Sequence, residues 1–259
     1  REKLLAVALT FHPHPRLYFN QPIQLISTDR QRRETLKCQL LDYLFFIDFG
    51  IVAAIPPHDF VRDFLLRRLC MKVLVVGEDF RFGRGREGDL ANLRREAATE
   101  HFKIILSPTV QIGGCRVARS LIRTKLAAGA IHEANHMLQR PYYIDGTVEK
   151  GAGRGSQLGF PTINTATDNQ ILPVGVFQTR IEIGKRLYAS VTNVGFAPTF
   201  HAGAAAPLKV ETHIPGFQRT VYGKKVRLHF IGKIREEKEF ASAQSLADQI
   251  RQDIARLGI

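Results

Sequence analysis

The pattern of predicted elements changes near Arg140-Pro141 and divides the chain in two. Before this point, short apolar runs such as 4–11 and 73–76 alternate with segments of helical periodicity. Such alternation is typical of an α/β domain with a doubly wound parallel sheet. After it, short strand-like segments follow one another without helices between them, as in an antiparallel barrel. With 259 residues the chain exceeds the usual size of one domain, so we predict two domains, 1–140 and 141–259.

The second part contains strand-like segments and one closing helix. Several of the segments alternate apolar and polar residues, the pattern of strands with one buried face. They are 142–149, 176–183, 187–193, 208–214 and 225–231. A final amphipathic segment places Leu246, Ile250, Ile254 and Leu257 on one helical face, with Ser242 as its N-cap. We therefore predict a small antiparallel β-barrel followed by a C-terminal helix.

Two apolar runs of the first part end in loops that suit ligand binding. His12-Pro13-His14-Pro15 follows the run 4–11, and the glycine- and arginine-rich segment 77–89 follows the run 73–76. Ligands of open α/β sheets bind at the carboxyl ends of strands, where His14 can contact phosphate or ribose. Taken alone, the tetrapeptide is more simply a proline-stiffened loop with incidental histidines. We also predict helices at 29–44, 57–69, 90–101, 120–129 and 130–138, and strands at 45–49 and 103–106.

Composition argues against several classes of protein. No run approaches the roughly 20 apolar residues of a membrane helix, and no signal peptide is visible, so we predict a cytoplasmic protein without a membrane partner. Cys38, Cys70 and Cys115 are odd in number and widely spaced, which argues against a disulfide framework or zinc site and predicts buried or incidental thiols. The net charge of +13 suits anionic ligands such as nucleotides. No nucleic-acid-binding signature accompanies the scattered arginines, so an RNA-binding module is a minor alternative.

A glycine-rich loop in the second part is a candidate phosphate site. Its glycines are Gly151, Gly153, Gly155 and Gly159. Glycines let backbone N–H groups approach a phosphate, and Lys150 and Arg154 add positive charge. Thr162 and Asn164, two residues apart on an extended path, present oxygens to one side, and oxygen ligands suit Mg²⁺. The alternative is a surface hairpin with two solvated basic residues.

Glu211 is the candidate catalytic base of the second part. It lies in Val210-Glu211-Thr212-His213, on a predicted strand. A carboxylate there can accept the proton of a primary alcohol that attacks the γ-phosphorus of ATP. A solvated surface glutamate is the commoner explanation of any single Glu.

These motifs resemble those of a known enzyme family. Gly151-x-x-Arg154-Gly155-x-x-x-Gly159-Phe160-Pro161-Thr162-x-Asn164 resembles the signature of riboflavin kinases, in which G-F-P-T-[AI]-N is highly specific. Phe11-x-Pro13-His14-Pro15 and Gly77-Glu78-Asp79-Phe80-x-Phe82-Gly83 resemble two motifs of a nucleotidylyltransferase domain. From Phe11 to the last helix, the chain resembles the bacterial bifunctional riboflavin kinase/FMN adenylyltransferase family, also called FAD synthetase.

For the second domain, the resemblance implies phosphorylation of riboflavin to FMN with Mg²⁺ and ATP. Glu211 matches the catalytic base of the family, with His213 in a supporting role. Thr162 and Asn164 would bind the metal ion and the substrate. The residues that would hold the phosphates of ATP are Lys150, Gly151, Gly155, Gly159, Thr162 and Asn164. The elements 192–195 and 198–200 also match and would lie near the flavin or the loop that covers it.

For the first domain, the resemblance implies adenylylation of FMN to FAD with release of pyrophosphate. The residues that would surround ATP and the FMN phosphate are Pro13, His14, Gly77, Asp79, Ser120 and Arg123. Arg123 matches the arginine of the family's S-S-[ST]-x-I-R element. Positioning and charge neutralisation would dominate this reaction, which requires no covalent intermediate.

The chain departs from the family pattern in two places. The family's first strand and its G-x-F-D-G-x-H-x-G-H loop would precede Leu4 and do not occur in the sequence. Ala118 and Arg119 stand where the family has small hydroxyl residues. These departures favour, as an alternative, a monofunctional riboflavin kinase with an inactive N-terminal domain. The sequence leaves the oligomeric state open.

Overall fold

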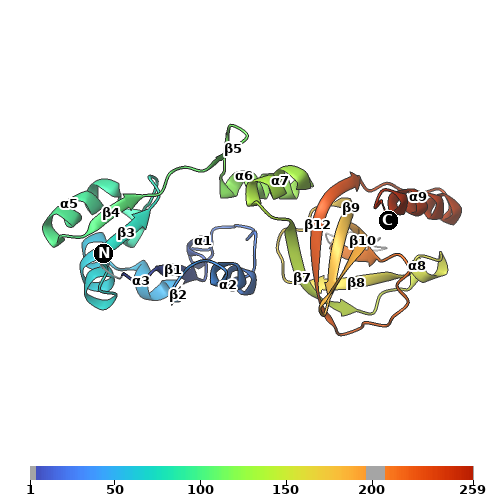
Figure 1. The fold of residues 1–259 in the computed structure, drawn as a ribbon, viewed down its shortest axis with the longest axis horizontal. Helices are drawn as coiled ribbons and strands as arrows, with labels where there is room; N and C mark the ends of the chain where they lie inside the picture. Colours follow the sequence, from blue (N-terminus) through green and yellow to red (C-terminus); the bar gives the residue numbers. More distant parts are fainter. Residues whose placement is uncertain (1–3, 197–207, 259) are drawn as a thin grey trace. The chain divides into compact units, whose positions relative to one another are not determined.

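The computed structural model describes residues 4–196 and 208–258 (Figure 1). Its contacts form two compact units. The first, here called the N-terminal unit, is Arg1–Ile23 with Asp29–Arg116, and the second, here called the barrel unit, is Gln24–Thr28 with Val117–Ile259. The grouping of residues 117–140 with the barrel concerns packing, and the domain boundary at Arg140-Pro141 stays a prediction.

The N-terminal unit has the alternating α/β pattern and the parallel pairing that the sequence predicts. β1 (Val7–His12) pairs in parallel with β2 (Tyr43–Asp48), and β3 (Val73–Val76) pairs in parallel with β4 (Lys103–Leu106). The helical segments between these strands are α1 (Pro15–Tyr18), α2 (Asp29–Lys37), α3 (Phe49–Ala53), α4 (Pro57–Asp59), the π-helix η1 (Phe60–Arg68), the 3-10 helix η2 (Arg84–Arg86) and α5 (Leu90–Glu100). A short antiparallel hairpin follows, β5 (Gln111–Ile112) with β6 (Cys115–Arg116). The helical segments that separate β1 from β2 and β3 from β4 are the crossover connections that parallel pairing requires.

One predicted helix of this unit is too long. The spacing of the leucines predicted a helix over 29–44, but α2 ends at Lys37 and β2 begins at Tyr43. Tyr43 pairs with Val7, and the whole of β2 stays in register with β1. The aromatic and β-branched residues of β2 suit a strand, so pairing with β1 overrides the helical spacing.

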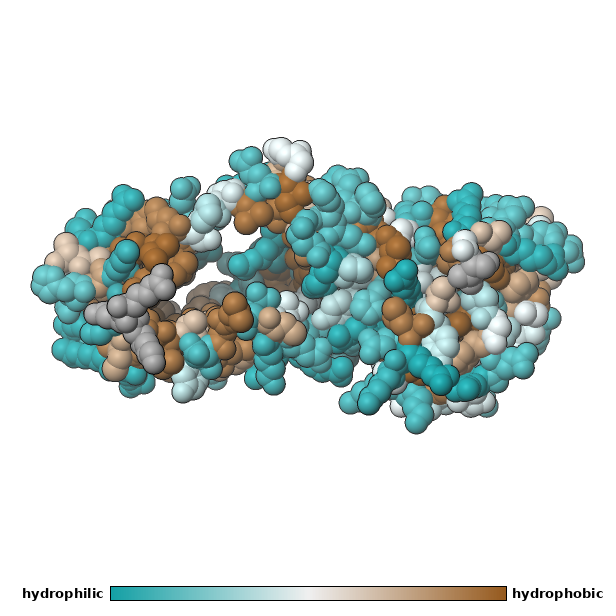
Figure 2. All heavy atoms as spheres, in the orientation of Figure 1, coloured by the Kyte–Doolittle hydropathy of each residue, from teal (hydrophilic) through white to brown (hydrophobic). Residues whose placement is uncertain are grey.

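The exposure of β1 differs from what its sequence pattern indicates. A continuous apolar run such as 4–11 is typical of a buried parallel strand, yet Val7 is 44% exposed and Leu5 is 63% exposed. Each parallel sheet has only two strands in the part of the chain that the structure describes, so their faces and edges are incompletely covered. Apolar surface is visible on this unit in Figure 2. The three cysteines are free and exposed, which fits incidental thiols, one of the two predicted alternatives.

The barrel unit contains a closed antiparallel barrel with the strand order β10-β11-β8-β7-β12-β9. Its strands are β7 (Tyr142–Glu149), β8 (Thr162–Thr167), β9 (Gly175–Ile183), β10 (Arg186–Phe196), β11 (Leu208–His213) and β12 (Lys225–Arg235). All five predicted strands are present, and β8 follows the glycine loop. Alternate side chains point inward, so Ile144, Phe177 and Leu228 are fully buried in the barrel core.

Four helices belong to this unit within the described residues: α6 (Arg119–Ala127), α7 (Ile131–Leu138), α8 (Arg154–Gln157) and α9 (Ala243–Ala255). Asn135 of α7 donates from Nδ2 to the Phe230 carbonyl at 2.9 Å and accepts from the Tyr142 N–H at 2.6 Å. The predicted N-cap of α9 is confirmed, since Ser242 accepts from the backbone N–H of Ser245 at 3.1 Å. These contacts attach α7 to β7 and β12 and fix where α9 begins.

A buried ion pair joins α9 to the end of β12. Arg235 donates to Asp253 Oδ2 from Nη2 at 2.8 Å and from Nε at 3.0 Å. The Asp253 side chain is 2% exposed, and Gln249 donates to its second oxygen at 2.9 Å. Because this carboxylate is removed from water, its charge depends on these donors.

The barrel interior also holds a continuous chain of hydroxyl groups. Thr212 Oγ1 lies 2.9 Å from Thr192 Oγ1, which lies 2.8 Å from Thr179 Oγ1. Thr179 Oγ1 in turn lies 2.8 Å from Ser190 Oγ. All four side chains are buried, and they satisfy one another across β11, β10 and β9.

His229 on the outer face of β12 gives the barrel unit a predicted dependence on pH. Burial, and then the nearby Arg227, lower the pKa of His229 below its ordinary value, while Glu182, 3.9 Å away, opposes this. The folded state therefore favours neutral His229, so its contribution to stability is present above pH about 6.5 and is lost as pH falls below that value. Between pH 7 and pH 5, the temperature of thermal unfolding should fall less in His229→Gln than in the wild type. An equal fall in both proteins would contradict the assignment.

Candidate active site

A row of three polar side chains crosses neighbouring strands on the outer face of the barrel. In the strand register, Glu211 of β11 stands opposite Asn164 of β8 on one side and Asn193 of β10 on the other. The alternate residues Val210 and Val194 are buried in the core. Because strand residues alternate between faces, Glu211 and both asparagines point away from the core. The barrel thus places one carboxylate between two amides.

The glycine loop closes over one end of this row. A Cβ atom at Gly151 would overlap the Asn164 amide group, and a Cβ atom at Gly155 would lie 2.5 Å from the Phe160 carbonyl oxygen. Gly153 has a φ of +73°, which favours glycine. Within the predicted loop, the structure has the single-turn helix α8. The sequence pattern did not show this turn, but its glycines let the loop pack directly against Asn164 and Thr162.

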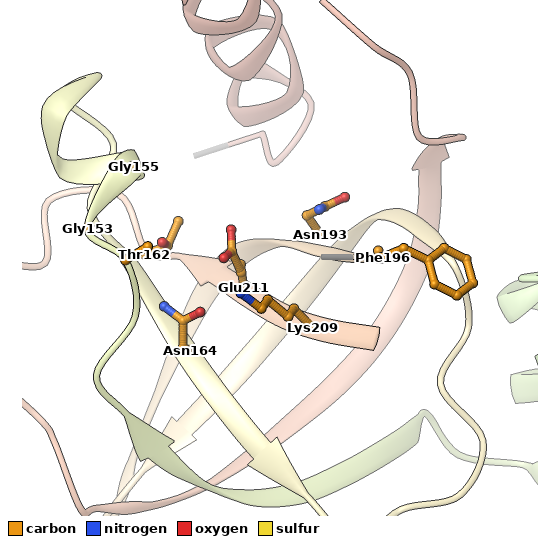
Figure 3. Close-up of a pocket in the computed structure, with 10 residues that line it drawn as sticks. Gly153, Gly155, Thr162, Asn164, Asn193, Phe196, Lys209 and Glu211 are labelled. Carbon is orange, nitrogen blue, oxygen red and sulfur yellow. The ribbon is translucent and has the colours of Figure 1, made fainter. Parts of the chain in front are cut away.

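These elements enclose a pocket of about 180 Å³ (Figure 3). Its lining residues are Ala152, Gly153, Gly155, Thr162, Asn164, Asn193, Gly195, Phe196, Lys209 and Glu211. The structure therefore brings together Gly155, Thr162, Asn164 and Glu211, four of the residues selected from the sequence. Gly151 borders the pocket through Asn164, whereas Lys150 and Gly159 are not part of the lining.

His213 lies beside the pocket and holds the start of β8. Its Nδ1 atom is 2.9 Å from the Pro161 carbonyl oxygen, and its ring meets Phe160 edge to face at 5.6 Å between centroids. His213 also stands opposite Thr162 in the register. These contacts orient the Phe160-Pro161-Thr162 segment, so they suit the supporting role that the sequence analysis gave to His213.

Sequence reasoning missed several residues at the site. Lys209 and Phe196 line the pocket but belong to none of the motifs selected from the sequence. Asn193 Nδ2 lies 3.4 Å from Glu237 Oε1, so the segment before α9 reaches the site. Nothing local in the sequence shows that the segment of Glu237 lies beside β10. The matching element 198–200 lies outside the described residues.

The oxygens of this pocket fit a hard cation. Thr162, Asn164 and Glu211 offer hydroxyl, amide and carboxylate oxygens at one pocket, and Mg²⁺ is bound through a few such oxygens together with water and substrate phosphates. Among the described residues there is no cluster of three or more His, Cys, Asp or Glu side chains suited to a metal ion. The donor set therefore suits a magnesium ion that is shared with a nucleotide.

The residues predicted for adenylylation lie in both units. In the N-terminal unit, Pro13 and His14 follow β1, and Gly77 and Asp79 follow β3, so each pair comes after the carboxyl end of a parallel strand. His14 Nδ1 accepts from the Arg16 N–H at 3.2 Å. Asp79 lies 3.7 Å from Arg116.

The other two of these residues, Ser120 and Arg123, lie on α6 of the barrel unit. Arg123 donates from Nε to the Gln24 carbonyl at 2.8 Å. Ala118 is the N-cap of α6 and makes no side-chain hydrogen bond to the helix, as expected for a residue without a hydroxyl group. The first turn of α6 therefore lacks the cap that a serine or threonine would supply.

Gly151→Ala is predicted to impair the pocket without unfolding the barrel. The added methyl group overlaps the Asn164 amide and must displace either the loop or Asn164. Displacements of about 1 Å at a reacting centre can lower a rate about a hundredfold, and we expect a fall of that size in any phosphoryl transfer at this site. The matched control is Gly232→Ala, where a Cβ atom would meet nothing within 4 Å. Wild-type activity in Gly151→Ala would show that the loop does not position Asn164.

Comparison with known proteins assigns a family description to each part of the chain. Residues 138–258 match the riboflavin kinase family model, and residues 1–121 match the FAD synthetase family model. The chain is 33% identical over 249 residues to the bifunctional riboflavin kinase/FMN adenylyltransferase of Escherichia coli K12, covering 92% of this chain and 79% of that protein. It is 28% identical to the protein of the same name from Bacillus subtilis, covering 97% of this chain and 81% of that protein.

A solved structure supports the fold. A crystal structure from Streptococcus pneumoniae, titled as a macrolide-efflux protein, superposes with a TM-score of 0.86 at 24% identity, covering 97% of this chain and 83% of that one. At this identity the likeness concerns the fold. In the part of the chain that the structure describes, no helix has the length and apolar character needed to cross a membrane.

Proposed function

This chain belongs to the bifunctional riboflavin kinase/FMN adenylyltransferase family, and we propose that it makes FMN and FAD in two successive reactions. The barrel would phosphorylate the ribityl 5′-hydroxyl of riboflavin with ATP, and the N-terminal domain would adenylylate FMN. The single observation that best supports the kinase reaction is the placement of Glu211 between Asn164 and Asn193, in a pocket bordered by the glycine loop.

In the kinase reaction, Glu211 acts as general base. The riboflavin hydroxyl gives its proton to the Glu211 carboxylate as its oxygen attacks the γ-phosphorus of ATP, and ADP leaves. Because Gly151 and Gly155 have no side chains, the loop packs closely against Asn164 and Phe160, and its backbone N–H groups would lie beside the phosphates. Thr162 and Asn164 are the residues that would hold Mg²⁺. When bound, this ion neutralises negative charge on the phosphates.

In the adenylylation reaction, a phosphate oxygen of FMN attacks the α-phosphorus of ATP, and pyrophosphate leaves. Pro13, His14, Gly77 and Asp79 would bind the substrates at the carboxyl ends of β1 and β3. Ser120 and Arg123 of α6 would contribute contacts to phosphate. One observation favours a kinase without this second activity, namely the uncapped Ala118 beside Arg119 at the start of α6.

We propose a cytoplasmic location, with riboflavin, FMN and ATP as the small-molecule partners. The excess positive charge would attract each of the phosphorylated substrates. The chemistry needs no nucleic acid or membrane partner.

The test is separation of flavins by chromatography after incubation of the chain with riboflavin, ATP and Mg²⁺. FMN followed by FAD is the expected result. FMN without FAD would favour the kinase-only alternative. If a folded chain produced neither compound, the proposed function would be wrong.

A further inference from the structure

Lys209 is a pocket-lining cation with no role in the reaction as described above. It lies on β11 two residues before Glu211, so both side chains leave the same face of the strand, with their Cα atoms about 7 Å apart. Its neighbour across the strands is Gly195, and the Glu237 carboxylate lies over this glycine, where a Cβ atom would overlap it. Figure 3 shows Lys209 beside Glu211, on the side toward Phe196.

Within the described residues, the ammonium group of Lys209 has no hydrogen-bond or ion-pair partner. Among the described residues, no carboxylate forms an ion pair with it, although Glu211 and Glu237 are both close to its strand neighbours. Lysine side chains are strongly hydrated and are seldom left beside a polar pocket without access to water or an anion. The lysine is therefore available to an anionic group that enters the pocket.

The order of residues along the strands indicates which anion this is. The glycine loop packs against Thr162 and Asn164, so the donor nucleotide belongs at that end of the pocket. Next along β11 comes Glu211, and beyond it Lys209. A phosphoryl group that moves from the donor to an alcohol held at Glu211 therefore moves toward Lys209.

Resting on the function proposed above, we infer that Lys209 binds the 5′-phosphate of the product FMN and the phosphoryl group as it is transferred. The transferred group spreads negative charge over its equatorial oxygens, and the ammonium group supplies donors to those oxygens. Riboflavin carries no phosphate, so its own binding does not depend on Lys209. Lys209 thus sets the preference of the acceptor site for product over substrate.

The experiment measures initial rates of ADP release with riboflavin as acceptor and FMN as product inhibitor. ADP release reports the kinase reaction alone, because adenylylation releases pyrophosphate. In Lys209→Met we expect the inhibition constant of FMN to rise about tenfold, the effect of losing a charge-assisted hydrogen bond, while the KM for riboflavin changes less than about twofold. Lys209→Arg should retain most of the affinity for FMN.

Two controls separate this role from others. Lys225→Met removes an exposed lysine of β12 and should leave FMN inhibition unchanged. Glu237→Gln tests whether Lys209 acts only through that neighbouring carboxylate, and an effect equal to that of Lys209→Met would overturn the inference. Unchanged FMN inhibition in Lys209→Met, in a protein whose wild type makes FMN, would also overturn it while leaving the kinase function intact. No FMN from the wild type would instead reject the proposed function itself.

Discussion

Glu211→Gln lowers the rate of riboflavin phosphorylation by about two to four orders of magnitude, if the carboxylate accepts the proton of the attacking alcohol. General-base catalysis typically contributes a factor of this size. Glutamine keeps the shape of the side chain but cannot take up the proton. The register that places Glu211 between Asn164 and Asn193 is unchanged by the substitution, so substrate affinity should change much less than kcat. The measurement is steady-state ADP release over a range of riboflavin concentrations.

The control for this prediction is Glu182→Gln, a glutamate on β9 outside the pocket lining. It should retain kinase activity close to that of the wild type. Adenylylation of added FMN should be the same in Glu211→Gln as in the wild type, because Glu211 belongs to the barrel pocket. A Glu211→Gln enzyme with more than about a tenth of the wild-type kcat would show that another group accepts the proton.

Asp253→Ala is expected to lower the free energy of unfolding of the barrel unit by about 3–5 kcal/mol. The substitution leaves the Arg235 guanidinium, which is 19% exposed, without its bidentate partner. It also removes the acceptor of Gln249. Guanidinium chloride unfolding followed by circular dichroism measures the change, with separate transitions fitted if the two units unfold separately.

The matched control is Asp248→Ala on the same helix, where the carboxylate is half exposed and pairs with Arg251. Exposed pairs contribute about 0–1 kcal/mol, so this variant should be close to the wild type. Replacing both Arg235 and Asp253 by apolar residues should recover part of the loss, since no buried charge is then left alone. Equal stability of Asp253→Ala and Asp248→Ala would contradict the role given to the pair.

The strands of the barrel could be predicted because their alternation of apolar and polar residues is local. Alternation along β11 likewise puts Lys209, Glu211 and His213 on one strand face. Which residues stand opposite one another depends on register between strands far apart in the chain, and alternation does not give that register. The alternation therefore does not predict that Asn193 stands opposite Glu211.

Other parts of the fold needed long-range information of the same kind. The leucine spacing at 29–44 fits a helix, but pairing of β2 with β1 decides the outcome for residues 43–48. Glu237 approaches Asn193 across 44 residues of sequence, and no local feature predicts that contact. The glycine loop was recognised because its residues are contiguous and chemically unusual.

The hydroxyl chain inside the barrel has a consequence for folding fidelity. If β11 slipped by one residue against β10, Thr212 would leave the core, and Thr192 would lose one of its two hydroxyl partners and keep only Thr179. One such hydrogen bond contributes about 0.5–1.5 kcal/mol, so a slipped register is less stable than the register observed. Glu211 and Asn193 are the chain neighbours of Thr212 and Thr192. The register that forms the hydroxyl chain inside the barrel is therefore the same register that places Glu211 opposite Asn193 at the pocket.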